Sequence, residues 1–190
     1  MVISEANLKK LEQLNNKKVM EYLQDAIDLC KPAKVTVITD SEEDINYVKE
    51  LALKNGEESK LRMEGHTVHF DGINDQGRDK ANTRYLVKEK VNWGIKVNDM
   101  LQPDGVAEVR EIMDGIMEGK EMLVSFFSLG PTNSPFSQRA MQITDSAYVT
   151  HSEQILYRTG YEEFKRLNGS DGDPAAHAPC PRQEPVEGDG

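Results

Sequence analysis

Apolar residues along the chain fall into two patterns, short β-branched runs and longer stretches with helical spacing. The short runs predict strands near residues 35–39, 66–70, 84–88, 122–127 and 139–144. Apolar residues that recur every three or four positions predict helices near residues 4–29, 42–55, 105–117 and 147–158. The order of these elements predicts an α/β fold, a mixed sheet with flanking helices, but it does not define the order of the strands.

Polar residues mark the ends of several predicted helices. Ser4 and Ser146 stand where a side-chain hydroxyl can cap a helix N-terminus. Ser41 and Asp44 resemble a capping box, and Asn55-Gly56 is a good stop signal. In the helix near 105–117, five residues at helical spacing are expected to face inward: Val106, Val109, Ile112, Met113 and Ile116.

Composition and charge exclude some classes of function. The 190 residues carry a formal net charge of −10, and the pI is about 4.9. This balance argues against a nucleic-acid partner, which needs a basic surface, and against an anionic membrane surface. No apolar run is long enough to span a bilayer, and the N-terminus has no signal-peptide pattern. Two cysteines, Cys30 and Cys180, do not form a disulfide framework. We therefore expect a cytoplasmic protein with free thiols.

The composition of the chain changes after Asn168. Residues 169–190 are rich in Gly, Pro and Asp and contain almost no large apolar residue. Such a segment cannot bury enough surface to offset its ordering entropy. We therefore predict one domain over residues 1–168 and a disordered tail over residues 169–190.

Candidate catalytic and metal-binding residues are few. His66 and His69 are three apart in a predicted strand, so they point to opposite faces and are poorly placed to share a metal. Ser134, Ser137 and Ser146 have no identifiable histidine or aspartate partner, which favours turn and capping roles over nucleophilic catalysis.

The loop Gly130–Pro135 is not a phosphate-binding loop. No Gly-Lys-Ser/Thr follows it, and its two prolines remove backbone donors that a phosphate would need. However, the longer stretch FFSLGPTNSPFSQRAMQITDSAYV resembles a stretch of GTP-dependent phosphoenolpyruvate carboxykinase that reads, in outline, PFSxGPxxSPxS…ITDSxYV. The run from Cys30-Lys-Pro to Thr39-Asp40-Ser41-Glu42-Glu43 is similar to the CxP…DGSEEE opening of the same family. The resemblance covers about residues 28–167.

The resemblance implies a fold and an activity. The fold expected is that of the carboxykinase N-terminal domain, and the family converts oxaloacetate and GTP to phosphoenolpyruvate, carbon dioxide and GDP in gluconeogenesis, as a monomer. A divalent metal, usually Mn²⁺, stabilises the enolate that decarboxylation generates. The family places its metal ligands, phosphate-binding Gly-Lys-Thr loop and guanine pocket in the C-terminal part, and no matching set occurs in this sequence. We therefore expect a chain that ends early, binds neither Mn²⁺ nor GTP alone, and has no catalytic residue and no activity by itself.

One residue is expected to bind substrate. Arg78 matches the arginine that the family uses to bind the oxaloacetate or phosphoenolpyruvate carboxylate, and Thr83 matches a nearby threonine. A guanidinium presents two parallel N–H donors to a planar carboxylate and stays charged. Lys80 stands where animal enzymes carry an acidic residue that touches a mobile lid, which leaves lid contacts open.

Two other interpretations stay open. One is a stand-alone carboxylate-binding or interaction domain without catalysis. The weaker one is a small Rossmann-like nucleotide binder built on residues 35–56. It is disfavoured because the acidic helix start at Asp40-Ser41-Glu42-Glu43 would repel a phosphate.

Overall fold

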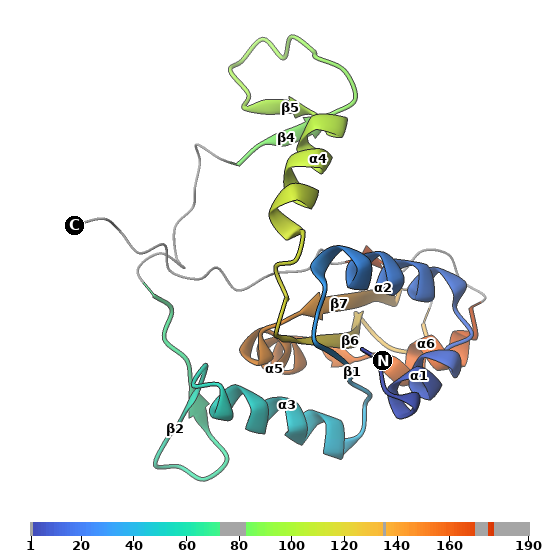
Figure 1. Ribbon diagram of the computed structural model, residues 1–190, viewed down its shortest axis with the longest axis vertical. Helices are drawn as coiled ribbons and strands as arrows, with labels where there is room; N and C mark the ends of the chain where they lie inside the picture. The colour runs from blue at the N-terminus through green and yellow to red at the C-terminus, as the bar shows by residue number, and fades with distance from the viewer. Residues whose placement is uncertain (1, 73–82, 135, 170–174, 177–190) are drawn as a thin grey trace. The chain divides into compact units, whose positions relative to one another are not determined.

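A computed structural model of the 190-residue chain describes residues 2–72, 83–134, 136–169 and 175–176. The chain forms two compact units (Figure 1). The first contains the described residues up to 69 and from 115 onward, and the second contains those between 70 and 114. We describe each unit by itself.

The first unit is built on a mixed sheet around one long central strand. This strand, β6 (Glu121–Leu129), pairs in parallel with β1 (Lys34–Val37) and antiparallel with β7 (Gln138–Thr144). β8 (Arg158–Thr159) also pairs with β6, and β9 (Ala175–Ala176) runs parallel to β7. The mixed sheet with flanking helices that the sequence predicts is confirmed.

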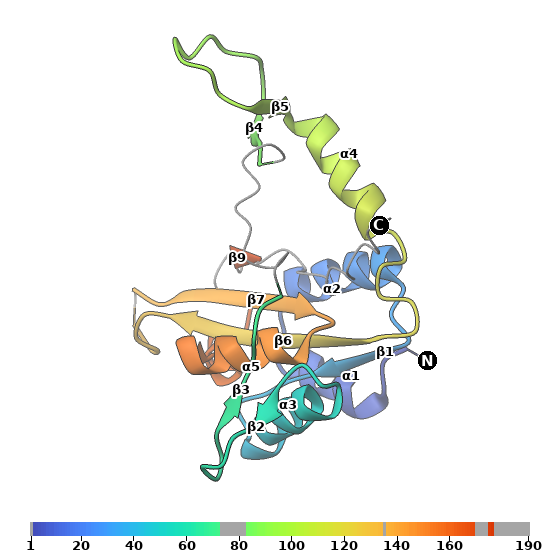
Figure 2. The same cartoon turned by 90° about the vertical axis from the view of Figure 1, so that its left-hand side faces the viewer.

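Burial explains why the run at 121–129 forms the centre. Seven consecutive residues of β6 are buried, as expected for a strand covered on both faces. Figure 2 shows α2 (Lys17–Cys30) on one side of the sheet and both α3 (Glu42–Lys54) and α5 (Ala147–Leu156) on the other. Leu123 packs in one core cluster with Val48 of α3 and Ala147 of α5. A small hairpin, β2 (Ser59–Lys60) and β3 (Thr67–Val68), follows α3.

The single helix predicted over residues 4–29 is wrong, because it is two helices. α1 (Glu5–Glu12) ends before Asn15, whose φ of +45° is left-handed and cannot continue a right-handed helix. Asn16 then caps α2, and its side-chain oxygen accepts from the backbone N–H groups of Lys18 and Val19 at 3.1 and 3.2 Å. Asparagine is well suited to both roles.

The three predicted serine caps are confirmed. Ser4, Ser41 and Ser146 each accept a hydrogen bond from the backbone N–H three residues further on. The helix predicted over 147–158 ends at Leu156, and α6 (Tyr161–Leu167) is a separate helix after β8. Cys30 is buried with a free thiol, whereas Cys180 lies outside the described residues.

The second unit is a strand–strand–helix arrangement. β4 (Tyr85–Val87) pairs in parallel with β5 (Asp99–Leu101), and α4 (Gln102–Met113) follows directly. The expected inward face of this helix is wrong at three positions: Val106, Val109 and Ile112 are 44%, 50% and 62% exposed. None of the helices in the described parts of either unit has the length and apolar character of a membrane-spanning segment.

Candidate functional site

A short helix, α6, joins the two segments that carry the family resemblance. One is the turn at residues 39–41 after β1, and the other is the turn at residues 130–134 between β6 and β7, called here the Gly130 turn. The carboxylate of Asp40 accepts hydrogen bonds from the first two backbone N–H groups of α6, and the carboxylate of Glu163 accepts one from the Gly130 turn. Two distant parts of the sequence are therefore fixed to the same seven-residue helix.

Asp40 caps α6 from outside the helix. Gly160, the residue before α6, has no side chain that could accept a hydrogen bond. The Asp40 carboxylate lies 2.9 Å from the backbone nitrogens of both Tyr161 and Glu162. A carboxylate is favoured there because it satisfies unpaired N–H groups and faces the positive end of the helix dipole.

Glu163 holds the Gly130 turn from the other side of α6. Its two oxygens lie 3.1 Å from the backbone nitrogen of Asn133, and Arg166 donates to the same carboxylate at 2.8 and 3.1 Å. The Glu163 side chain is only 4% exposed. The hydrogen bonds from Arg166 lower the pKa of Glu163 despite burial, with a further contribution from the Asn133 N–H. The carboxylate is thus held ionised in the native state.

Further contacts fix the shape of the turn. Arg158 donates to the carbonyl oxygen of Gly130 at 3.0 Å, and the hydroxyls of Ser128 and Ser137 are 2.8 Å apart. Ser134 accepts from the backbone N–H of Phe136 at 3.2 Å. The hydroxyls of Ser134 and Ser137 therefore take part in turn contacts, in line with the structural roles predicted for them.

Gly160 lets α6 approach the sheet closely. A Cβ atom at this position would lie 2.6 Å from the carbonyl carbon of Phe127, and the backbone N–H of Gly160 donates to the carbonyl oxygen of Phe126 at 2.8 Å. The Phe126 ring in turn packs edge-on against Tyr161 and Phe164. Only glycine fits between the helix start and strand β6.

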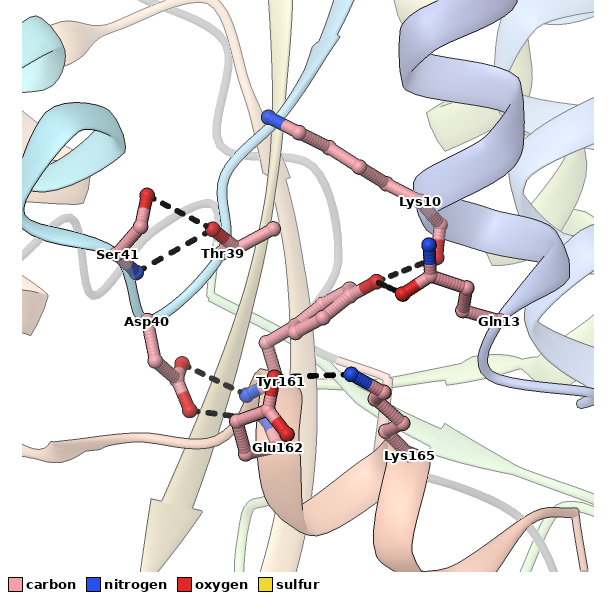
Figure 3. Close-up of a pocket in the computed structure, with 8 residues that line it drawn as sticks. All are labelled: Lys10, Gln13, Thr39, Asp40, Ser41, Tyr161, Glu162 and Lys165. Carbon is pink, nitrogen blue, oxygen red and sulfur yellow. Dashed lines mark hydrogen bonds and ion pairs between the residues drawn. The ribbon is translucent and has the colours of Figure 1, made fainter.

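A pocket of about 380 Å³ opens beside the Asp40 cap (Figure 3). It lies where α1, the turn after β1 and α6 meet. Figure 3 shows its eight lining residues, which are mostly polar or charged: Lys10, Gln13, Thr39, Asp40, Ser41, Tyr161, Glu162 and Lys165.

One charged group of the pocket is part of an ion pair beneath it. Lys10 Nζ lies 2.9 Å from the Asp44 carboxylate and 3.0 Å from the carbonyl oxygen of Val37. Burial alone would raise the pKa of Asp44, but hydrogen bonds from Lys10 and from Thr39 outweigh it and hold the pKa below its usual value. The Asp44 side chain therefore binds Thr39 and Lys10, while the Asp44 backbone N–H donates to the Ser41 hydroxyl.

The hydroxyl of Tyr161, the tyrosine of the pocket, is also engaged in a hydrogen bond. It donates to the carbonyl oxygen of Lys10 at 2.7 Å. Burial raises the pKa of Tyr161, and the nearby carboxylates of Glu162 and Asp40 raise it further. A phenol that stays protonated and donates inward cannot act as a base. Lys165 is likewise paired with Glu162, at 3.4 Å.

These contacts define what the pocket can do. Its charged groups mostly bind one another or backbone, and the described part of the chain brings together no three His, Cys, Asp or Glu side chains that could hold a metal. The arrangement can admit a small polar solute, and its Thr39 hydroxyl is already bound to the Asp44 carboxylate, which Lys10 also pairs with. We regard it as the structural junction that positions the Gly130 turn.

A second junction ties the end of α3 to the start of α5. Burial tends to raise the pKa of Glu57, but hydrogen bonds from Ser146 at 2.6 Å and from the Tyr148 N–H at 2.9 Å lower it. Glu58 is 2.6 Å from Nδ1 of His151, and the Glu58 side chain is 3% exposed.

The two histidines considered for a metal have different partners. His66 Nδ1 is 3.1 Å from the carbonyl oxygen of Glu64. His69 Nδ1 is 2.6 Å from the carbonyl oxygen of Glu57, and its ring stacks on Tyr148 with centroids 3.5 Å apart. The strand predicted at 66–70 is shorter than expected and covers only Thr67–Val68.

The predicted substrate-binding residue lies outside the described residues. Arg78 and Lys80 belong to this group, whereas Thr83 is described. The carbonyl oxygen of Thr83 accepts from the Asn98 side chain at 2.8 Å, in the second unit. The role of Arg78 therefore stays a prediction.

Sequence reasoning missed the roles of Asp40, Glu57 and Glu163. Each accepts hydrogen bonds from residues far away in the chain, which a local pattern does not reveal. One signal was available for Asp40: α6 begins after a glycine, so its first N–H groups need an acceptor from elsewhere.

Comparison with known proteins identifies the family. The family model for the phosphoenolpyruvate carboxykinase N-terminal domain matches residues 21–187, so the match continues past residue 167, the end of the resemblance expected from the motifs. A phosphoenolpyruvate carboxykinase [GTP] of Thermococcus sibiricus is 52% identical over 158 residues, which are 83% of this chain and 25% of that protein. The protein of the same name from Pyrococcus abyssi is 53% identical over 87% of this chain and 26% of its own length. The protein of the same name from Saccharolobus solfataricus is 44% identical over 83% of this chain and 26% of its own length.

The chain thus spans about a quarter of the length of the curated relatives that it matches. The matched region contains both turns that α6 holds together, and it includes the Arg78 segment. On this evidence the chain belongs to the phosphoenolpyruvate carboxykinase N-terminal domain family.

Proposed function

We propose that this chain is the substrate-side N-terminal part of a GTP-dependent phosphoenolpyruvate carboxykinase. In this function oxaloacetate and GTP give phosphoenolpyruvate, carbon dioxide and GDP. The observation that carries the proposal is the identity of about 50% to proteins named phosphoenolpyruvate carboxykinase [GTP]. We further propose a cytoplasmic, monomeric enzyme that binds neither nucleic acid nor membranes, which fits the net charge of −10.

Arg78 is the residue of this chain that we assign to substrate. Its guanidinium would bind the carboxylate of oxaloacetate or phosphoenolpyruvate through two parallel N–H donors. Such a charge-assisted contact contributes about 1.5–3 kcal/mol, which suffices to orient the substrate. Arg78 thus positions the substrate and does not perform the chemistry itself.

GTP and Mn²⁺ complete the proposed activity. The metal would supply charge stabilisation to the enolate. The described residues do not fit a metal site, because no three His, Cys, Asp or Glu side chains converge among them. We therefore assign no ligand for the metal or the nucleotide among the described residues, and we expect no carboxykinase activity from the chain alone.

The test uses a fusion protein in which this chain is extended to the full length of its relatives. Residues 2–167 of this chain would be joined to the remaining three quarters of the Pyrococcus abyssi protein, which is 53% identical over the matched region. Steady-state kinetics would then compare the fusion with its Arg78→Gln variant. We expect the KM for phosphoenolpyruvate to rise about 10- to 150-fold, the equivalent of 1.5–3 kcal/mol, with the KM for the nucleotide unchanged.

Arg62→Gln is the matched control, because Arg62 is an exposed arginine of the first unit. It should leave both KM values unchanged. An Arg78→Gln fusion with the parental KM for phosphoenolpyruvate would contradict the role of Arg78. Turnover by the isolated chain would contradict its proposed dependence on the rest of the enzyme.

A further inference from the structure

The second unit contains a helix that its own strands cannot cover. β4 and β5 have three residues each, so they span about 10 Å along the strand direction. α4 has 12 residues and is therefore about 18 Å long. Helix and strands meet at Gly105, where a Cβ atom would lie 2.3 Å from Leu86. The later turns of α4 extend beyond this contact (Figure 1).

The side of α4 that faces the strands continues as an apolar strip. Glu108, one turn after Gly105, is 3.0 Å from Arg84 at the start of β4. Ile112, one turn further, lies on the same side because residues three and four apart share a helix face. Val109 and Val106 lie beside this line, both on the same side of it and at successive three-residue spacings from Ile112, and the three apolar side chains are 44–62% exposed. We call Val106, Val109 and Ile112 the α4 strip.

The β4–β5 pair also has uncovered surfaces. They form a parallel pair, and no third strand joins it among the residues that the structure describes. Parallel sheets normally have both faces covered, and two strands alone are marginally stable. Here Leu86 faces α4, so Tyr85, its neighbour in the strand, points to the opposite face, where it is 67% exposed.

The relatives indicate what covers these surfaces. Each is about four times as long as the part matched here, which leaves some three quarters of a carboxykinase chain as a candidate partner. We propose that the α4 strip and the β4–β5 pair are a docking surface for that remaining part of a carboxykinase chain. The partner region contributes an apolar surface against the strip and at least one strand that extends the pair. This inference rests on family membership and is independent of the role of Arg78.

The test compares the same substitutions in the chain alone and in the fusion with the Pyrococcus abyssi protein described above. Val109→Asp/Ile112→Asp places two charges on the strip. In the fusion it should lower the melting temperature by about 5 °C or more, because the charges would be buried. In the chain alone it should leave the melting temperature unchanged, since both positions are exposed. Ala107→Asp/Glu111→Gln, at exposed positions on the opposite side of α4, is the control and should change neither protein.

Hydrogen exchange provides a second readout. Backbone amides of residues 85–87 and 99–101 should exchange quickly in the chain alone and at least tenfold more slowly in the fusion. Equal exchange in both proteins, or an unchanged melting temperature of the Asp variant fusion, would overturn the proposal. A lower melting temperature of the variant chain alone would overturn it in favour of the first unit as occupant. Concentration-dependent self-association of the chain that the Asp pair abolishes would overturn it in favour of a second copy.

Discussion

Two carboxylates, those of Asp40 and Glu163, hold the turn at residues 39–41 and the Gly130 turn in position on α6. Asp40 and Glu163 both accept hydrogen bonds from backbone N–H groups, whose positions are fixed by the fold itself, and Glu163 also pairs with Arg166. A charged acceptor at the start of α6 is favourable because the first N–H groups of a helix have no partner within the helix. The role of these two carboxylates is therefore structural. They fix the position of the Gly130 turn relative to α6.

Asp40→Ala should destabilise the first unit by about 1–2 kcal/mol, the usual effect of losing a helix cap. Two backbone N–H groups of α6 would lose their acceptor. Asp40→Asn keeps an acceptor oxygen without the charge, so its free energy of unfolding should lie between those of the parent and the Asp40→Ala variant. Urea denaturation monitored by circular dichroism measures these differences. Equal stability of the alanine variant and the parent would show that the cap contributes nothing.

At the scale of elements, α6 packs closely on β6 at Gly160. Gly160→Ala should cost about 3 kcal/mol, because the new methyl group would overlap the backbone of Phe127 rather than a movable side chain. Gly119→Ala is the control: a Cβ there meets nothing within 4 Å, and the cost comes only from its φ of +75°. That cost should be about 1 kcal/mol. A thermal melt in which both variants lose the same stability would contradict the packing argument.

The elements that the sequence predicts correctly are those set by local patterns. The apolar run at 122–127 forms the buried strand β6, and the three serine caps occur where a hydroxyl precedes a helical pattern. The break between α1 and α2 is not predicted, because apolar spacing continues across Asn15 and Asn16. The face of α4 is mispredicted for a different reason: helical spacing identifies an apolar side but not whether anything covers it.

The candidate site follows the same division. Its two turns are recognised from local motifs, whereas the contacts of Asp40 and Glu163 depend on residues brought together by the fold. Arg78 is assigned by resemblance alone and stays a prediction.

At the scale of the molecule, ionised carboxylates support the fold in several places. The pKa values of Asp44, Glu57 and Glu163 are all lowered by hydrogen bonds in the native state. Glu121 belongs to the same group: burial tends to raise its pKa, but hydrogen bonds from Lys34, Thr36 and Tyr47 lower it. Each of these side chains therefore binds protons more weakly in the folded than in the unfolded chain.

The sign of the resulting pH dependence follows from linkage. A carboxyl group with a lowered native pKa contributes its stabilisation fully above the pKa of the unfolded chain, about 4 for Asp and Glu, and loses it as the pH falls through the native value. The pKa values of Lys34, Tyr47 and Tyr161 are raised, so these groups affect stability at alkaline pH. Their contribution to the free energy of unfolding is complete below about pH 10 and is lost as the pH rises further. Stability should therefore be nearly constant between about pH 5 and pH 9 and fall on both sides.

Denaturant midpoints measured from pH 7 down to pH 3 test this expectation. The free energy of unfolding should decrease steadily below about pH 5. Glu57→Gln should be less stable than the parent at pH 7, because the amide replaces a carboxylate that binds Ser146 and the Tyr148 N–H. It should also lose less stability between pH 5 and pH 3, since one of the groups that must be protonated is gone. If the variant and the parent showed parallel pH profiles, the buried Glu57 carboxylate would not be a source of the acid sensitivity, and the junction between α3 and α5 would owe its stability to packing alone.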